Sequence, residues 1–163
     1  MSDLLTAYKE VMSHWPSGVA IVTSVLGSKR YGMTISSFTS VSLHPAMVSI
    51  CVDKRAQMCG LLQKSKKFSV NILDNTQVEL ALAFANHDIE MHERFQKAEF
   101  NNSETQSPVL NPCLAWLDCE LHSFHDTGDH VIYVGQVLKA KTVEQKDPVI
   151  YYKRGWYGHL TRL

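Results

Sequence analysis

The sequence predicts a mainly antiparallel β-barrel with helices at its ends. Three observations lead to this fold class. Six or more segments carry the β-branched and aromatic residues of strands, two or three others show helical spacing, and strands and helices do not alternate regularly. A chain of 163 residues can bury a sizeable core without disulfides, so we expect one domain over residues 1–163.

The first segment is predicted to be a helix, because apolar residues between Leu4 and Trp15 recur at spacings of three and four. Residues 16–18, a proline, a serine and a glycine, end it. A β-branched strand over 19–25 follows, and after a polar turn a second strand begins at Gly32.

A hydroxyl-rich stretch separates this second strand from Pro45. It runs from Ser37 to His44 and interleaves apolar side chains with serine and threonine, and we expect a loop there. Small hydroxyls beside accessible backbone N–H groups suit an anion or the edge of a heteroaromatic ring. Such a loop could equally satisfy only its own backbone.

The middle of the chain continues with mixed elements. Strands are predicted over 47–52 and 68–73, and helical spacing is found over 56–63. A further helix is expected over 76–84, with Thr76 as its N-cap.

The periodic pattern is lost over 87–112, a polar segment that we expect to be a long functional or poorly ordered loop. Strands return over 114–124 and 130–143, around a turn at 126–129. The C-terminal segment 148–163 is rich in aromatic residues and short turns.

Composition excludes several classes of partner. Sixteen basic and sixteen acidic residues give a formal net charge of zero, so nothing points to nucleic acid or an anionic membrane. The four cysteines form no paired pattern, which favours a reducing, cytoplasmic compartment. The N-terminal segment carries charges within its apolar pattern, so we expect neither a signal peptide nor a membrane span.

One spacing, Cys119-x-x-His122-x-x-His125, is typical of metal ligands. On a strand, however, Cys119 and His125 share one face and His122 points to the other, so the three side chains do not converge without a bulge. Structural zinc sites also use four ligands in tight pairs. We therefore expect no metal.

Nucleotide binding must use something other than the common glycine-rich loops. The eight glycines form neither G-x-G-x-x-G nor a P-loop, so a nicotinamide nucleotide would have to lie on another ligand. Gly128-Asp129-His130 is followed by Gly135. By itself, His130 could be a polar side chain that begins a strand.

Taken together, these segments resemble the short-chain flavin reductases, a family of FMN-binding split barrels that includes the reductase components of two-component flavin monooxygenases. The similarity covers nearly the whole chain. It rests on G-M-T-I-S-S-F-T-S-V-S-L-H-P over 32–45, S-G-V-A-I-V-T-S over 17–24, the G-D-H motif at 128–130 after Trp-x-x-Cys over 116–119, and Y-Y-K-R-G over 151–155.

The resemblance implies an FMN-binding split β-barrel, antiparallel and Greek-key-like, with flanking α-helices, that forms a homodimer. It implies FMN as cofactor, with FAD as the other candidate, and NADH or NADPH as co-substrate. It also implies a flavin-dependent monooxygenase as partner, reached by diffusing reduced flavin. Hydride transfer to flavin N5 needs no protein acid or base, so the absence of a triad or carboxylate pair from the sequence is no objection.

The resemblance also implies site residues. His130 belongs to the motif tied to NADH use and is the expected catalytic residue. The expected cofactor-binding residues are Met33, Thr34, Ser36, Ser37, Ser40, Val41, Ser42, Cys51, Asp53, Lys54, Arg55, Gln57, Phe84, Ala85, Phe95, Tyr152 and Tyr157.

The chain departs from the family at Lys54 and Arg55. Many members have a Ser-x-Thr stretch after this strand, whereas here two cations would offer charge to the phosphate. The pair could equally be a solvated strand end. Phe84 and Phe95 could equally serve packing alone.

Two function classes remain from the sequence. The first is an NAD(P)H:flavin oxidoreductase that supplies reduced flavin to a separate oxygenase. The second is a flavoprotein that retains FMN and acts as an electron carrier, or reduces a metal complex or corrinoid. The G-D-H motif favours the first.

Overall fold

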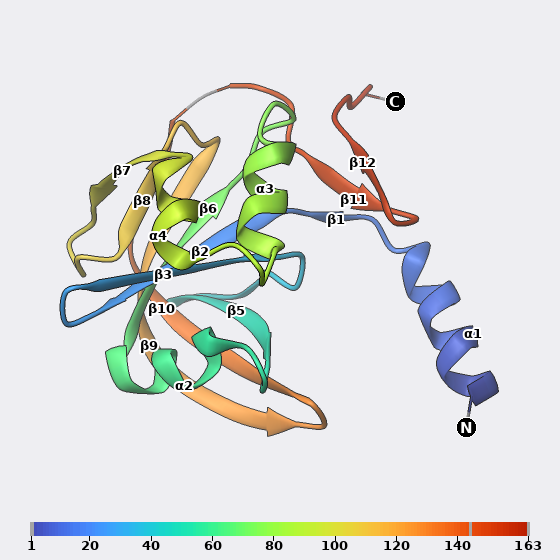
Figure 1. Cartoon of the computed structure of the whole chain (residues 1–163), viewed down its shortest axis with the longest axis horizontal. Coiled ribbons are helices and arrows are strands. Elements are labelled where there is room, and N and C mark those ends of the chain that lie inside the picture. Colours follow the sequence, from blue (N-terminus) through green and yellow to red (C-terminus); the bar gives the residue numbers. More distant parts are fainter. Residues whose placement is uncertain (1, 144, 163) are drawn as a thin grey trace.

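A computed structural model describes residues 2–143 and 145–162 and is built around one antiparallel sheet (Figure 1). Its seven strands are β2 (Ala20–Leu26), β3 (Lys29–Ile35), β4 (Thr39–Leu43), β5 (Ala46–Asp53), β6 (Lys67–Ile72), β9 (Ala115–Thr127) and β10 (His130–Thr142). They follow the order β3-β2-β6-β9-β10-β5-β4, and the two outer strands, β3 and β4, are not neighbours in it. The predicted mainly β fold, a split antiparallel barrel with flanking helices, is confirmed.

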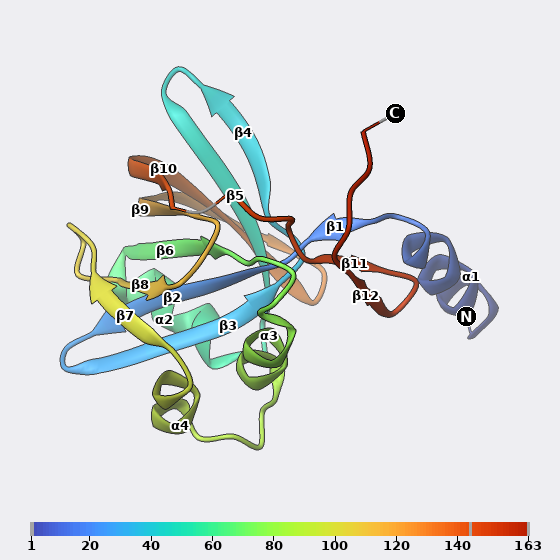
Figure 2. The same cartoon turned by 90° about the horizontal axis from the view of Figure 1, so that it is seen from above.

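Helices and short strands surround this sheet. The helices are α1 (Ser2–Ser13), α2 (Gln57–Ser65), α3 (Val78–Ala85) and α4 (Met91–Gln96). The short strands are β1 (Ser17–Gly18), β7 (Glu99–Asn102), β8 (Pro108–Asn111), β11 (Ile150–Tyr152) and β12 (Gly155–Tyr157). In Figures 1 and 2, α1 and the β11–β12 hairpin lie at one end of the molecule and β7–β8 at the other. No helix of the described ranges is long and apolar enough to cross a membrane.

Two apolar clusters hold the sheet. The first fills the interior of the curled sheet beneath α2 and includes Val22, Ile50, Val52, Phe68 and Tyr133. The second lies between the outer face of the sheet and α3–α4 and includes Ile21, Leu73, Phe84, Phe95 and Leu110. Strand β2 contributes to both clusters, which explains why its sequence is a continuous β-branched run rather than an alternating one.

Two motif glycines allow aromatic rings to lie against the backbone. A Cβ on Gly32 would lie 2.5 Å from Cε1 of Phe84, and a Cβ on Gly135 would lie 2.4 Å from Cζ of Phe68. Real Cβ atoms do not approach other atoms this closely, so a side chain at either position would force the aromatic ring to move. The glycines of the G-M-T and G-D-H-x4-G segments therefore have a packing role in each cluster.

The hydroxyl-rich stretch differs from the prediction. Residues 39–43, expected as a loop, form β4, which pairs with β5 at the edge of the sheet with a register shift between Ser40 and Ser42. As an edge strand β4 is largely exposed, with Leu43 78% accessible, so it lacks the alternating burial that identifies strands.

The expected long loop over 87–112 was also wrong, because it contains α4, β7 and β8. These short elements are stabilised by tertiary contacts: Phe95 packs edge-on against Phe84 and Phe100, and Asn71 accepts a hydrogen bond from the Leu110 N–H. The predicted cap of α3 was wrong as well. This helix begins at Val78, and the Thr76 hydroxyl donates to Asp74 instead.

Candidate functional site

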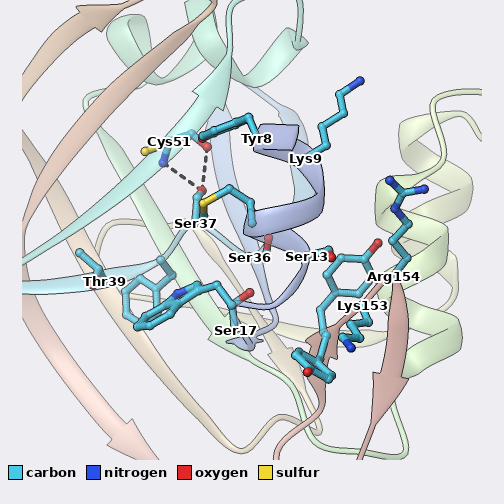
Figure 3. Close-up of a pocket in the computed structure, with 15 residues that line it drawn as sticks. Tyr8, Lys9, Ser13, Ser17, Ser36, Ser37, Thr39, Cys51, Lys153 and Arg154 are labelled. Atoms are coloured by element: carbon cyan, nitrogen blue, oxygen red, sulfur yellow. Dashed lines mark hydrogen bonds between the residues drawn. The ribbon is translucent and has the colours of Figure 1, made fainter. Parts of the chain in front are cut away.

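A cavity of about 830 Å³ lies between the two ends of the chain and the sheet (Figure 3). Its walls come from α1, the β3–β4 connection, β5 and the β11–β12 hairpin. Hydroxyl groups line it at Ser13, Ser17, Ser36, Ser37 and Thr39, and aromatic rings line it at Tyr8, Trp15, Phe38, Tyr151 and Tyr152.

The charges of this cavity all have one sign. Lys9, Lys153 and Arg154 line it, and no described lining residue is an aspartate or glutamate. Aromatic walls suit a planar ring, hydroxyls suit its polar edge, and unopposed cations suit a phosphate. The chemistry of the cavity therefore fits a flavin or nicotinamide nucleotide.

The hydroxyls that line or adjoin the cavity fall into two groups. Ser37 donates to the Cys51 carbonyl at 2.9 Å and accepts from the Cys51 N–H at 3.1 Å, and Thr34 donates to the Ala81 carbonyl at 2.6 Å. These two side chains fix β3 and its connection to β5 and α3. By contrast, Ser36 and Thr39 are exposed, and neither side chain hydrogen bonds within the described chain.

A second cavity of about 420 Å³ is lined by Met33, Asp53, Arg55, Ala56 and His87. Burial alternates along β5, so Asp53 shares a strand face with Cys51 of the first cavity. Sequence reasoning missed His87, because it lies in the segment where the periodic pattern is lost.

The two cations expected to hold the phosphate are paired within the protein. Lys54 Nζ lies 2.9 Å from Asp126 Oδ1, and Arg55 Nη2 lies 2.7 Å from Asp53 Oδ2. The hydrogen bonds from Arg55 hold the pKa of the Asp53 carboxyl well below its usual range. In this structure each of the two cations is therefore neutralised by an aspartate of the same chain.

His130 also has a partner. Its Nδ1 lies 2.7 Å from Asp129 Oδ1, which lowers the pKa of the Asp129 carboxyl, and the ring is about half exposed. His130 pairs in register with Asp53 across the β10–β5 ladder. It therefore lies beside a residue that lines the second cavity, although it does not itself line either of the two cavities.

The remaining predicted residues are spread over the fold. Phe84 and Phe95 are buried in the second apolar cluster, as their packing alternative requires, and Ala85 is exposed. Gln57 lines a different hollow beside α4. Ser40, Val41 and Ser42 lie on the edge strand β4, and Tyr157 packs its ring 5.8 Å from that of Tyr152.

Of the predicted set, the first cavity brings together Ser36, Ser37, Cys51 and Tyr152, and the second brings together Met33, Asp53 and Arg55. Sequence reasoning assigned no cofactor-binding role to Lys153, Arg154, Tyr8 or Trp15. These residues come from opposite ends of the chain, so no local pattern joins them.

The three side chains of the spacing Cys119-x-x-His122-x-x-His125 lie in different environments. Cys119 is fully buried, and His122 and His125 are exposed on the same strand. Burial raises the pKa of the Cys119 thiol to about 12, which disfavours the thiolate that a metal would need. Among the described residues no three His, Cys, Asp or Glu side chains are placed to hold a metal ion.

Comparison with known proteins places this chain among flavin enzymes. Residues 12–160 match the family described as "Flavin reductase like domain". A flavin reductase from Pseudomonas putida is 34% identical, over 93% of this chain and 87% of its own length. The reductase component of 4-hydroxyphenylacetate 3-monooxygenase from Thermus thermophilus is 31% identical, over 92% of this chain and 93% of its own.

Solved structures agree with these relatives. BorF, the flavin reductase component of a bacterial two-component tryptophan halogenase, superposes with a TM-score of 0.89 at 33% identity, over 96% of this chain and 99% of that one. The NADH:FAD oxidoreductase SgcE6 of Streptomyces globisporus, solved with NAD and FAD fragments, superposes with a TM-score of 0.88 at 32% identity, over 95% and 92%.

Proposed function

The chain belongs to the flavin reductase like domain family and is an oxidoreductase, and we propose that it uses NADH or NADPH to reduce FMN for a separate monooxygenase. The observation that carries this proposal is the cavity of about 830 Å³, which combines hydroxyls, aromatic rings and unopposed cations. Relatives named as monooxygenase reductase components favour diffusing reduced flavin over an FMN-retaining carrier.

The residues present fit a flavin nucleotide. The hydroxyls of Ser36 and Thr39, which make no hydrogen bond within the described chain, suit the polar edge of the ring or the ribityl chain, and Tyr8, Trp15 and Tyr152 offer apolar faces. When bound there, the flavin supplies a hydride acceptor. The protein has to orient two planar rings against each other and exclude water, and neither task needs a general acid or base.

We also propose that the protein is a homodimer. Helix α1 has little apolar cover in one copy of the chain: Leu4 is 78% exposed, Leu5 54% and Val11 68%. The edge strand β4 is similarly open, with Val41 52% exposed. Exposed apolar side chains gathered on one helix mark an interaction surface, and a second copy would cover them. Light scattering after size exclusion is expected to give twice the chain mass.

Steady-state oxidation of NADH, with and without added free flavin, tests the proposed function. We expect turnover that rises with added FMN and is nearly absent without it, because the flavin acts as a substrate that leaves. FAD, riboflavin and NADPH are tested in parallel to rank flavins and nicotinamide nucleotides. Full activity of the purified protein without added flavin would instead support the FMN-retaining alternative, and no NADH oxidation with any flavin would overturn the proposal.

A further inference from the structure

The hairpin between β11 and β12 has a strained turn. Tyr152 pairs with Gly155, so Lys153 and Arg154 are its two central residues, and their φ angles are 46° and 61°. A two-residue turn with positive φ at both positions is type I′, which strongly prefers asparagine and glycine. Residues with long side chains are disfavoured in this left-handed region, so Lys-Arg costs stability that Asn-Gly would not.

The strained residues line the candidate site. Both Lys153 and Arg154 line the cavity of about 830 Å³, and Figure 3 shows them on the side away from Ser37 and Thr39. The Lys153 N–H donates to the Ser13 carbonyl at 2.9 Å, which ties the turn to the end of α1. The backbone therefore holds two cations at the cavity in a conformation that their side chains do not favour.

Their charges are unopposed. Over residues 2–143 and 145–162, neither Lys153 nor Arg154 forms an ion pair, whereas Lys54 and Arg55 each have an aspartate within 2.9 Å. The Lys153 ammonium lies 5.7 Å from the centre of the Tyr152 ring, and this contact does not use its N–H donors for a hydrogen bond. With Lys9, the two residues give the cavity a positive potential and no described carboxylate.

We propose that Lys153 and Arg154 bind a phosphate group of the nucleotide substrate and that the type I′ turn is retained to present them. Strained backbone at a ligand site is kept when the surrounding structure fixes it, and here β11–β12 pairing and the contact to α1 do so. An ammonium and a planar guanidinium side by side match the oxygens of a phosphate. The phosphate belongs to the flavin or to the nicotinamide nucleotide, and the inference rests on the proposed function.

The double variant K153N/R154G tests this inference. It installs the preferred type I′ residues, so the hairpin is retained and its strain relieved, while both cations are removed. We expect Tm to rise by about 2–4 °C and binding of the phosphate-bearing ligand to weaken by about tenfold or more. If K153N/R154G loses affinity for FMN but not for riboflavin, the two cations bind the phosphate of the flavin. If kcat/KM falls for NADH but not for the phosphate-free 1-benzyl-1,4-dihydronicotinamide, the two cations bind a phosphate of the nicotinamide nucleotide.

Lys66→Gly is the matched control, because Lys66 is also a lysine with positive φ (59°) and does not line this cavity. It is expected to raise Tm similarly and leave every ligand unchanged. K153R/R154K, which keeps one ammonium and one guanidinium in the turn, is expected to lose much less affinity for the phosphate-bearing ligand than K153N/R154G.

Unchanged FMN affinity and unchanged kcat/KM for NADH in K153N/R154G would overturn the inference, as would equal losses for ligands with and without phosphate. These outcomes leave the proposed function standing if the wild type reduces flavin. Inactivity of the wild type with every flavin would reject the proposed function, and the FMN and riboflavin titrations would still test the turn.

Discussion

The candidate site has two sides that use the same residue types differently. On the paired side every polar group has a partner within the protein: Thr34, Ser37, Asp53, Lys54, Arg55 and His130. On the open side Ser36, Thr39, Lys153 and Arg154 line the cavity with no side-chain hydrogen bond or ion pair in the described chain.

This difference separates residues that hold the fold from residues that are free to hold a ligand. Ser36 and Ser37 are neighbours in sequence, yet only Ser37 joins the β3–β4 connection to β5. Lys54 and Arg55 resemble Lys153 and Arg154 in sequence, yet only the first pair meets aspartates. Residue type alone therefore does not identify the groups that bind a ligand. A side chain is available for a ligand only where the fold does not already give it a hydrogen-bond or ion-pair partner.

The largest expected effect is next to the paired side, at Gly32, which precedes Thr34 on β3 and packs against the second apolar cluster. In Gly32→Ala the new Cβ would lie 2.5 Å from the Phe84 ring, so the ring has to move within a packed cluster. Overpacking of this kind costs about 1–3 kcal/mol of the free energy of unfolding. Urea denaturation measures it. A free energy of unfolding equal to that of wild type would show that the glycine is not kept for packing. Gly60→Ala is the control, because a Cβ at Gly60 would meet no atom within 4 Å.

His130 tests whether a paired residue also contributes to catalysis. One hydrogen bond to the nicotinamide nucleotide contributes about 0.5–3 kcal/mol, so His130→Ala is expected to lower kcat/KM for NADH by roughly 3- to 150-fold. Flavin affinity and Tm should barely change. Asp129→Asn, which removes the partner at 2.7 Å, is the control. If it reproduces the whole loss, or if His130→Ala unfolds the protein, His130 serves the turn and the nicotinamide nucleotide is bound elsewhere.

The neighbouring serines give a smaller and more direct contrast. Ser37→Ala leaves the Cys51 N–H and carbonyl without their partner, which costs about 1–3 kcal/mol of stability with little change in flavin affinity once folded. Ser36→Ala should leave stability unchanged and weaken flavin binding by roughly 2- to 12-fold, the equivalent of one hydrogen bond. Thermal unfolding and flavin fluorescence quenching measure both variants. The opposite assignment of effects would remove the distinction between the two sides.

The smallest expected effect is on the stability of the fold at acidic pH. Arg55 lowers the folded-state pKa of Asp53, so the pair stabilises the fold fully above the unfolded pKa of about 3.9 and loses this contribution as pH falls toward the lower, folded pKa. Asp53→Asn should therefore flatten the pH dependence of unfolding below about pH 4. The slope should be the same for both proteins at pH 6–8. A difference confined to neutral pH would contradict the assigned partner.

The sequence was informative where burial leaves a local pattern. Strands β2, β3, β5, β6, β9 and β10 were predicted because their apolar side chains pack on one or both faces. Strand β4 was missed because an edge strand buries little. Helix α4 and strands β7 and β8 were missed because tertiary contacts of Phe95 and Asn71 stabilise them, and such contacts leave no periodic pattern. The part of the cavity formed by Ser36, Ser37 and Cys51 was predicted. Most of the wall formed by α1 and the β11–β12 hairpin was missed, because these elements come from opposite ends of the chain.

The partners of charged groups were not predictable either. Asp126 neutralises Lys54 from a strand that lies far along the sequence, and the positive φ angles of Lys153 and Arg154 have no signal in a Lys-Arg-Gly segment. Both facts depend on the three-dimensional structure, and both change which cations are available for a phosphate.

The central claim is that unpartnered groups of the open side bind the nucleotide. Its most direct test compares K54N/R55Q with K153N/R154G in one set of measurements, FMN and riboflavin titrations together with kcat/KM for NADH. Each variant removes two cations from the same protein, so the change in net charge is equal. The account predicts a loss of about tenfold or more for a phosphate-bearing ligand in K153N/R154G, and less than about threefold in K54N/R55Q. The reverse order, or equal losses in both variants, would contradict it.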